Sequence, residues 1–502
     1  MHRSGKNDNK MQSTSPTNNA NNHAQERILK NTSYLTIAFI LQKILSFLYF
    51  IYIARSLGPV DLGLYDPIKS LIPILLILID FSLSVVLVRE IARTPSKTED
   101  YLSAVLGIKV IFAFAVILSM GLFTNFSEYS SLIKTILYLD AIIVILDTFT
   151  LTFFAVFRGM QNMKYESLGI IGTQVLTIIF GVTSLILNWG LQTLFIAVLV
   201  GSIFNFCFSY LMLKKKLKIK IKLGWNNEII KKFLRIALPF AMAAILVKIY
   251  TYTDRFMLLT LAGQGYVGWY ITAHKLTYAL EFIPSAFAVS IFPAMSAFFI
   301  YSRKSLAKTF EKTFNYLMIL AIPISFGMIV LADKLILTIY GTAFETSITP
   351  LRILMVGLVV VFLNFPVGAF LNACNRQIIN TMNMAITVGF NVIINLFLIP
   401  YFTFNGAAVA ALVSGFILFF LGLRWVGKII DYQKKLLLKS LGKTFISGIT
   451  MVIVLLLTRD YLMIYFLIPI GAITYFIVLY LLRGITKHDL QIFYKSFIKK
   501  LA

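Results

Sequence analysis

The sequence predicts an all-α integral membrane protein with about fourteen transmembrane helices. Of its 502 residues, 59% are hydrophobic and only 13% are charged, whereas soluble domains average about 25% charged residues. Apolar runs follow one another from residue 33 onward, most of them reaching the roughly 20 residues that a helix needs to cross a bilayer. So little charge excludes a soluble enzyme, a disordered protein and a secreted disulfide scaffold.

The apolar runs are separated by Gly, Pro or charged residues, and these breaks define the individual spans. Before them, residues 1–32 are rich in Asn, Ser and Thr and are predicted to form a disordered tail. The predicted spans are approximately 33–56, 68–91, 101–124, 131–157, 167–188, 190–213, 233–260, 268–299, 313–332, 350–373, 378–400, 405–427, 441–458 and 461–482.

Positive charge is distributed unevenly between the two sides of these spans. The chain has 46 Lys and Arg against 21 Asp and Glu. If the N-terminal tail is cytoplasmic, 33 of the 46 fall on the cytoplasmic side, two in outer loops and 11 within spans. Because cytoplasmic loops of membrane proteins carry the excess of Lys and Arg, both termini are predicted to be cytoplasmic. This explains the positive charge without nucleic acid. The predicted location is the cell (inner/plasma) membrane. The run Lys214–Lys222 is either this topology signal or a patch for lipid headgroups.

A weak internal repeat divides the chain into two halves. At an offset of 205 residues, identical residues recur as the pairs Lys43 and Lys248, Gly58 and Gly263, Gly63 and Gly268, and Tyr65 and Tyr270. Each half has six spans, so the halves share one orientation and are predicted to be related by a pseudo-two-fold axis along the membrane normal. The predicted domains are a tail (1–32), an N-lobe with helices 1–6 (33–213), a basic cytoplasmic linker (214–232), a C-lobe with helices 7–12 (233–427), and a final helix pair with a basic tail (428–502).

Charged residues within the spans are the candidates for function, because each costs about 2.5–3.5 kcal/mol at mid-bilayer. Lys43 and Lys248 lie at matched mid-span positions, and Lys248, Tyr252 and Arg255 share one helix face. The predicted substrate-binding residues are Lys43, Lys248, Arg255, Lys275, Tyr252, Arg89 and Lys109. The predicted coupling or structural charges are Asp80, Asp140, Asp147, Asp254 and Glu281.

Structural roles are open for several of these residues. Arg89 lies near a span end and could extend to the interface, Asp254 and Arg255 could form an interhelical pair, and Asp140 and Asp147 could be packing residues. No metal site or cofactor is predicted, since the four His are isolated, and Gly442-Lys443-Thr444 lacks the glycine of a phosphate loop because position 437 is Leu437. Short outer loops also disfavour catalysis, so the chain is predicted not to be an enzyme.

Several short stretches together resemble the polysaccharide flippase family of the multidrug/oligosaccharidyl-lipid/polysaccharide exporter superfamily. The stretches are Ala54–Tyr65, Val88–Ala92, Phe157–Gln161, Leu238-Pro239, Asp254-Arg255, Ile291–Ala294 and Leu371–Ala373. Their order and spacing extend the resemblance over residues 30–430. The resemblance implies two six-helix lobes with a central cleft that alternately opens to either side. It also implies that a polyprenyl-pyrophosphate-linked oligosaccharide moves from the inner to the outer leaflet, with glycosyltransferases or a polymerase of the same pathway as possible partners.

The charge balance bears on the alternatives. Within the spans 11 cations outnumber six carboxylates, and cations in a low-dielectric cleft attract a pyrophosphate strongly. A cation-coupled drug exporter of the same superfamily would instead need an acidic cleft. A lipid II flippase remains open on charge alone, and a membrane glycan polymerase is disfavoured by the short outer loops.

Overall fold

The structure is a computed structural model that describes residues 16–485, with side chains described from residue 33. Within that part of the chain every regular element is a helix. Among residues 16–485, twelve helices are long and apolar enough to cross a membrane. Two of them contain a non-helical residue, Gly58 in α1 (Pro16–Asp80) and Thr403 in α13 (Gln377–Ile429), and each therefore comprises two helical segments. The predicted all-helical membrane fold is confirmed.

The chain divides into two compact units, which we call unit 1 and unit 2. Unit 1 comprises residues 1–48 and 75–241, and unit 2 comprises residues 49–74 and 242–502. The long α1 therefore contributes its beginning and its end to unit 1 and its middle to unit 2. α7 (Asn227–Leu261) is likewise shared between the units.

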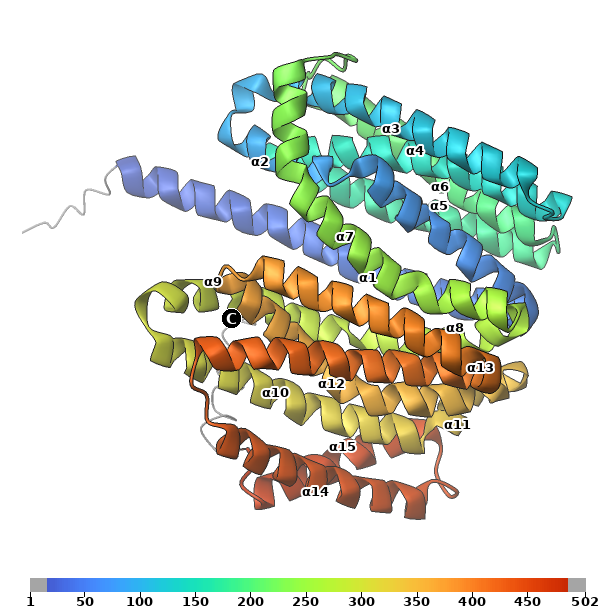
Figure 1. Cartoon of the computed structure of the whole chain (residues 1–502), viewed down its shortest axis with the longest axis vertical. Helices are drawn as coiled ribbons and strands as arrows, with labels where there is room; N and C mark the ends of the chain where they lie inside the picture. The colour runs from blue at the N-terminus through green and yellow to red at the C-terminus, as the bar shows by residue number, and fades with distance from the viewer. Residues whose placement is uncertain (1–15, 486–502) are drawn as a thin grey trace, which may run out of the picture. The chain divides into compact units, whose positions relative to one another are not determined.

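Unit 1 is built mainly from helices that run alongside one another (Figure 1). α4 packs against α2, α3 and α6, and α5 packs against α6. The helices of this unit are α2 (Leu83–Arg93), the short 3-10 turn η1 (Pro95–Lys97), α3 (Thr98–Phe126), α4 (Ser131–Gly159), α5 (Lys164–Ile186) and α6 (Leu191–Lys216).

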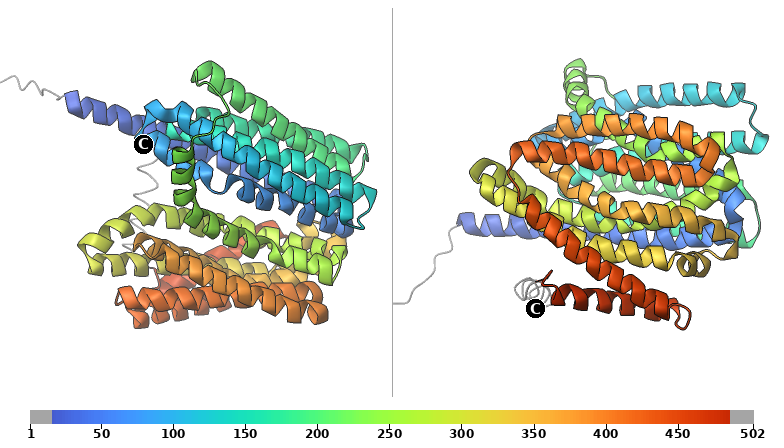
Figure 2. Two further views of the ribbon diagram at one scale, coloured as in Figure 1. Left: turned by 45° about the horizontal axis from the view of Figure 1, so that its top comes forward. Right: turned by 60° about the horizontal axis from the view of Figure 1, so that its bottom comes forward.

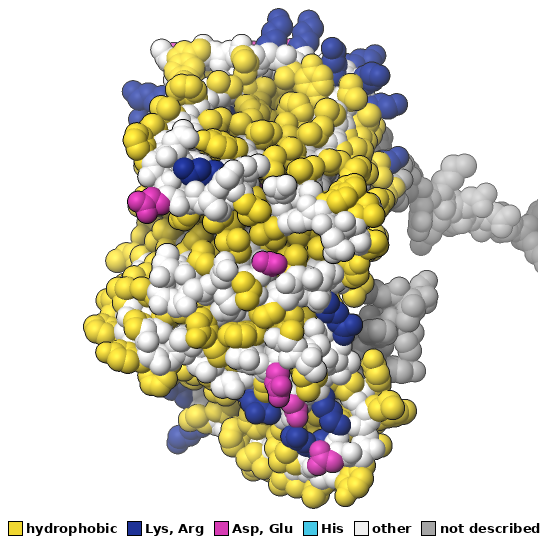
Figure 3. All heavy atoms as spheres, turned by 90° about the vertical axis from the view of Figure 1, so that its right-hand side faces the viewer, with side chains coloured by type: hydrophobic (Ala, Val, Ile, Leu, Met, Phe, Trp, Pro, Cys, Tyr) yellow, Lys and Arg dark blue, Asp and Glu magenta, His cyan; other side chains and the backbone are white. Residues whose placement is uncertain are grey.

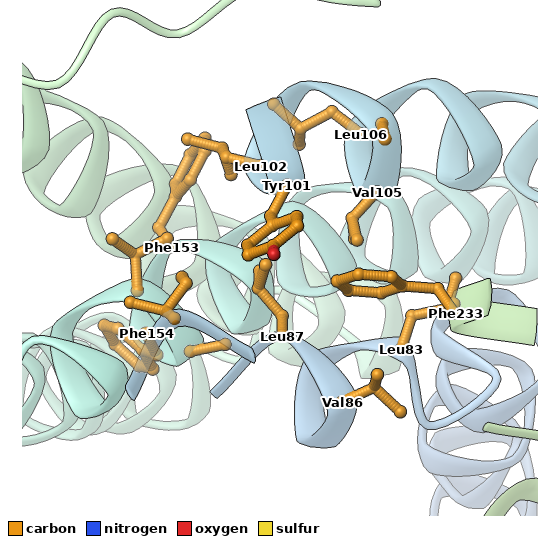
Figure 4. Close-up of a cluster of buried hydrophobic side chains, with 14 of the residues drawn as sticks. Leu83, Val86, Leu87, Tyr101, Leu102, Val105, Leu106, Phe153, Phe154 and Phe233 are labelled. Atoms are coloured by element: carbon orange, nitrogen blue, oxygen red, sulfur yellow. The ribbon is translucent and has the colours of Figure 1, made fainter. Parts of the chain in front are cut away.

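The core of unit 1 is a cluster of buried apolar side chains from α2, α3, α4 and α7 (Figure 4). The rings of Tyr101 and Phe233 lie 5.5 Å apart between centroids, and Phe153 and Phe154 lie in the same cluster. Fully burying one such side chain contributes about 1.5–3 kcal/mol. Ile219 of the basic linker is also buried here, while Lys218 and Lys220 beside it are exposed. The linker is therefore attached to unit 1 by its apolar residues.

Unit 2 places α12 (Ile348–Ala373) at its centre, in contact with α8, α9, α10 and α13. α14 (Lys434–Thr458) and α15 (Ile464–Leu481) form a pair beside α10, visible in the right view of Figure 2. The other elements of this unit are α8 (Gln264–Leu280), α9 (Phe282–Tyr301), α10 (Arg303–Val330), α11 (Ala332–Ile339) and η2 (Thr342–Ser347).

Three predicted boundaries differ from the observed helices. The span predicted over 68–91 is interrupted at Phe81 (φ 44°) and Ser82 (φ 57°), where α1 ends and α2 begins. The span predicted over 268–299 consists of two helices, α8 and α9, that meet at Glu281. The break at Phe81 and Ser82 has no Gly or Pro at its centre, whereas Pro284 in the first turn of α9 is a local signal for the break at Glu281. At the N-terminus α1 begins at Pro16, inside the predicted tail, and residues 1–15 lie outside the described residues.

The glycines of the internal repeat have matching structural roles. Gly58 and Gly263 both have positive φ, 71° and 110°, a backbone conformation that other residues rarely adopt. A Cβ atom added to Gly63 would lie 1.7 Å from the carbonyl oxygen of Gln264, and one added to Gly268 would lie 1.9 Å from that of Pro59. Since Pro59 and Gln264 are also 205 residues apart, these two contacts are equivalent under the repeat. The middle of α1 and α8 therefore pack through a local two-fold relation, and only glycine permits this approach.

Candidate anion-binding site

The contact between the middle of α1 and α8 carries a group of charged side chains, which we call the Asp66 cluster. It consists of Asp66, Lys69, Arg255 and Lys275, all within unit 2. Asp66 and Arg255 are buried, with side chains only 7% exposed, whereas the side chain of Lys275 is 31% exposed. The cluster is therefore mostly buried, with Lys275 as its partly exposed member.

Arg255 is the most firmly held member of the cluster. Its Nη1 donates to Asp66 Oδ2 at 2.8 Å and to Ser70 Oγ at 3.0 Å. Its Nε is buried and has no hydrogen-bond partner among the described residues. Its guanidinium lies 5.0 Å from the centroid of the Tyr252 ring, and Lys248 Nζ lies 5.9 Å from the same ring. The predicted shared face of Lys248, Tyr252 and Arg255 is thus present on α7.

The two lysines complete the cluster. Lys275 Nζ lies 3.7 Å from Asp66 Oδ1 and 5.0 Å from the Phe50 ring centroid, and Lys69 Nζ donates to Tyr65 OH at 2.9 Å. One carboxylate therefore faces both Arg255 and Lys275, and Lys69 adds a further positive charge near it. Charges interact far more strongly in a partly buried site than in water, so the arrangement favours a multiply charged anion.

Asp254 and Arg255, although adjacent in sequence, have different partners. Asp254 is buried and accepts hydrogen bonds from Tyr270 OH at 2.9 Å and from Asn395 Nδ2 at 2.7 Å. Asn395 Nδ2 also donates to Asn391 Oδ1 at 3.1 Å. Asp254 therefore connects α7 to α8 and α13, and the pairing partner of Arg255 is Asp66.

Lys109 and Asp80 form a second buried network, in unit 1. Lys109 is fully buried, and its Nζ donates to Asp80 Oδ1 at 2.6 Å and to Thr152 Oγ1 at 2.6 Å. It also lies within hydrogen-bond distance of Ser84 Oγ (3.1 Å) and the Thr148 carbonyl (3.0 Å). These contacts use the whole bonding capacity of the ammonium, since it has three N–H donors. The network spans the break between α1 and α2 and favours a positioning role for Lys109.

The remaining predicted residues are not members of the Asp66 cluster. In unit 1, Arg89 is half exposed, 3.9 Å from Glu90, whose carboxylate also pairs with Lys232. Asp140 is buried, and Asp147 has a hydrogen bond with Ser202. Lys43 is an exposed residue of the unit 1 part of α1, and Glu281 is half buried at the junction of α8 and α9.

Sequence reasoning missed Asp66, the central residue of the cluster. The second span was predicted to begin at residue 68, which placed Asp66 in an outer loop and left it out of the count of six carboxylates. A usable signal was present, because Asp66 and Lys69 are three residues apart and follow Tyr65, which matches Tyr270 in the repeat.

Another group of charges gathers on the end of the helices shown in Figure 3. Basic and acidic side chains lie together in the lower part of that view. Where α11 meets the turn between α14 and α15, Arg459 pairs with Asp333 at 3.0 Å and with Asp460 at 3.3 Å, and Lys334 Nζ donates to the Leu462 carbonyl. Because these charges are mutually compensated, they join α11 to the α14–α15 turn and do not form an anion site.

Comparisons with known proteins agree on fold and family. A family model described as polysaccharide biosynthesis protein matches residues 28–299. The probable low-salt glycan biosynthesis flippase Agl15 of Haloferax volcanii is 25% identical over 395 residues, which covers 77% of this chain and 81% of that protein. The capsular polysaccharide biosynthesis protein CapF of Staphylococcus aureus is 24% identical over 403 residues, with 78% and 97% covered. The inward closed structure of the lipid II flippase MurJ superposes with a TM-score of 0.73 at 18% identity, covering 92% of this chain and 99% of that one.

Proposed function

Because the chain belongs to the polysaccharide biosynthesis protein family, we propose that it is a flippase for a polyprenyl-pyrophosphate-linked oligosaccharide. It moves this repeat unit of a polysaccharide from the inner to the outer leaflet by alternating access. The similar proteins Agl15 and CapF, named for glycan biosynthesis flipping and capsular polysaccharide biosynthesis, support this cargo. The MurJ-like fold supports a lipid-linked substrate of this general kind.

The observation that carries the proposal is the excess positive charge of the Asp66 cluster. A pyrophosphate is a compact anion with several acceptor oxygens, and both Arg and Lys are suited to bind it. Lys275 is partly exposed and Arg255 has an unused buried donor, so the two offer charge and hydrogen bonds to the same group. Tyr252 beside them offers a surface for sugar rings. The prenyl tail stays in lipid, so only the head group has to cross in a polar environment.

Further parts of the proposal rest on sequence. Lys43 and Lys248 are proposed to bind the pyrophosphate or acidic sugars, because they occupy matched positions of the repeat. The excess of Lys and Arg in alternate loops supports a cell-membrane location with both termini in the cytoplasm. The oligosaccharide must be assembled before it is moved, so glycosyltransferases of the same pathway are proposed partners.

The test replaces Lys275 and expresses each variant in a strain that lacks its own flippase. Lys275→Gln is expected to lower surface polysaccharide at least tenfold at an unchanged protein level, because it removes a charge without opening the firm Arg255–Asp66 contact. Lys275→Arg should retain most of the activity, since it keeps the charge. The matched control is Lys435→Gln, an exposed lysine of α14 outside the cluster.

Full complementation by a Lys69→Gln/Lys275→Gln double variant would overturn the role of the cluster. The cargo is tested separately with the purified protein in liposomes, where flipping of lipid II in preference to the oligosaccharide lipid would favour the lipid II alternative. A drug exporter would transport neither lipid.

A further inference from the structure

A second cationic site lies at the beginning of α10 and is unrelated to the Asp66 cluster. A cavity of about 620 Å³ opens between the first three turns of α10 and the segment that joins α13 to α14. We call it the α10 pocket. Its charged lining residues are Arg303, Lys304, Lys308, Lys312, Glu311 and Asp431. The volume falls within the range of about 300–1,000 Å³ that is typical of small-ligand sites.

The walls of the α10 pocket are fixed by contacts on both sides. The backbone N–H of Gln433 donates to Glu311 Oε1 at 2.6 Å, and Ser440 Oγ donates to Asn315 Oδ1. Below these contacts the rings of Phe310 and Tyr432 lie 5.8 Å apart at 62°. The joining segment is therefore attached to α10 at several points, and these contacts hold the two walls of the pocket together.

The charges of the pocket are not balanced. Lys304, Lys308 and Lys312 recur every four residues and so lie along one face of α10. Among the described residues none of the three has an ion pair within 4.0 Å. Of the two carboxylates, Glu311 is engaged by the Gln433 backbone. Like charges at this spacing repel one another, and an anion bound between them would relieve that repulsion.

We infer that the α10 pocket binds a phosphorylated anion, either a free phosphate or pyrophosphate or the headgroup of an anionic phospholipid. Lysine ammonium groups bind phosphate as point charges, and Arg303 adds a guanidinium that is held against the Phe299 ring at 4.0 Å. The pocket lies on the side of the spans that carries most of the Lys and Arg, and anionic lipids of the cytoplasmic leaflet attract basic residues. This site is additional to transport, since none of its residues belongs to the Asp66 cluster.

The test compares two triple variants that each remove three lysine charges. Lys304→Gln/Lys308→Gln/Lys312→Gln changes the pocket, and Lys214→Gln/Lys215→Gln/Lys216→Gln changes exposed lysines at the end of α6 in unit 1. The affinity of the purified full chain is measured for inorganic pyrophosphate by calorimetry in detergent. Native mass spectrometry measures how much phosphatidylglycerol remains bound to the chain compared with phosphatidylcholine.

The site is supported if either probe binds saturably to the native chain and if the pocket variant, but not the control variant, weakens that binding at least tenfold. Pyrophosphate binding alone identifies a soluble anion, and phosphatidylglycerol binding alone identifies a lipid headgroup. Binding of neither probe, or equal affinity in both triple variants, overturns the inference. So does loss of binding in Lys275→Gln with normal binding in the pocket variant, because the anion would then bind at the Asp66 cluster. If the triple variant does not fold, Lys308→Gln alone is compared with Lys215→Gln.

Discussion

The buried pair of Lys109 and Asp80 allows a structural role to be separated from a substrate-binding role. Lys109→Met would leave the Asp80 carboxylate buried without its cation, which lies 2.6 Å away in the native protein. Breaking a buried ion pair on one side typically costs about 3–5 kcal/mol, a large share of the roughly 5–15 kcal/mol by which proteins are stable. We therefore expect Lys109→Met, and likewise Asp80→Asn, to lower both the melting temperature in detergent and the amount of protein in the membrane.

The double variant Asp80→Asn/Lys109→Met decides between the roles. It removes both charges, and Ser84, which donates to Asp80 Oδ1 at 2.5 Å, can still bond the new amide. We expect its melting temperature to recover most of the loss seen in the single variants, and transport to recover with it. A double variant that is stable and abundant but inactive would refute the reasoning and assign Lys109 to the substrate. Additive losses in the double variant would show that the two side chains do not act as a pair.

Three further outcomes follow from local geometry. Gly63→Ala should abolish accumulation of folded protein, since its Cβ would meet the Gln264 carbonyl at 1.7 Å, whereas Gly265→Ala, with its nearest neighbour at 3.7 Å, should be tolerated; equal protein levels on immunoblots would contradict this contact. Burial raises the pKa of Cys374 from the usual 9.0 to about 11. In a Cys207→Ala background the alkylation of Cys374 at pH 8 should therefore be about a hundredfold slower than that of an ordinary thiol and should still accelerate above pH 9; a rate that levels off near pH 9 would contradict this pKa. An impermeant thiol reagent should label exposed single cysteines at positions 130 and 346 in intact cells but not those at positions 96 and 435; the opposite pattern would invert the proposed orientation.

Sequence reasoning recovered the number of spans because lipid imposes a strict requirement. A backbone in the membrane must satisfy its own hydrogen bonds, so nearly every crossing appears as a run of about 20 apolar residues. The break at Phe81 and Ser82 was not predictable in this way, because two ordinary residues adopt positive φ there. The surrounding side chains of Asp80, Ser84 and Lys109 hold the ends of the two helices in place. Such a break depends on tertiary contacts that no local pattern records.

The candidate site was only partly predictable for a related reason. The helix face of Lys248, Tyr252 and Arg255 followed from the period of an α-helix and is present in the structure. The partner of Arg255 did not follow, because Asp66 lies 189 residues away and joins α7 only through packing. Lys109 shows the reverse case. The free-energy cost of placing its charge in the membrane suggested that Lys109 binds the substrate. The structure instead surrounds its ammonium group with acceptors from three other helical segments.

The internal repeat explains why geometry and charge behave differently at the Asp66 cluster. Gly63 and Gly268 are the same residue in both copies, because their backbones approach too closely for any side chain. The neighbouring contacts keep the same positions but exchange chemistry. Lys275 lies over the Phe50 ring, and the equivalent contact, 205 residues away on each side, is the hydrogen bond from Arg255 to Ser70. In these two contacts Arg255 and Lys275 come from the second copy, and their partners Ser70 and Phe50 from the first are neutral. The first copy also supplies Asp66, the carboxylate that both cations face, and Lys69. A two-fold scaffold therefore carries an asymmetric distribution of charge, which is compatible with the single anionic head group proposed above.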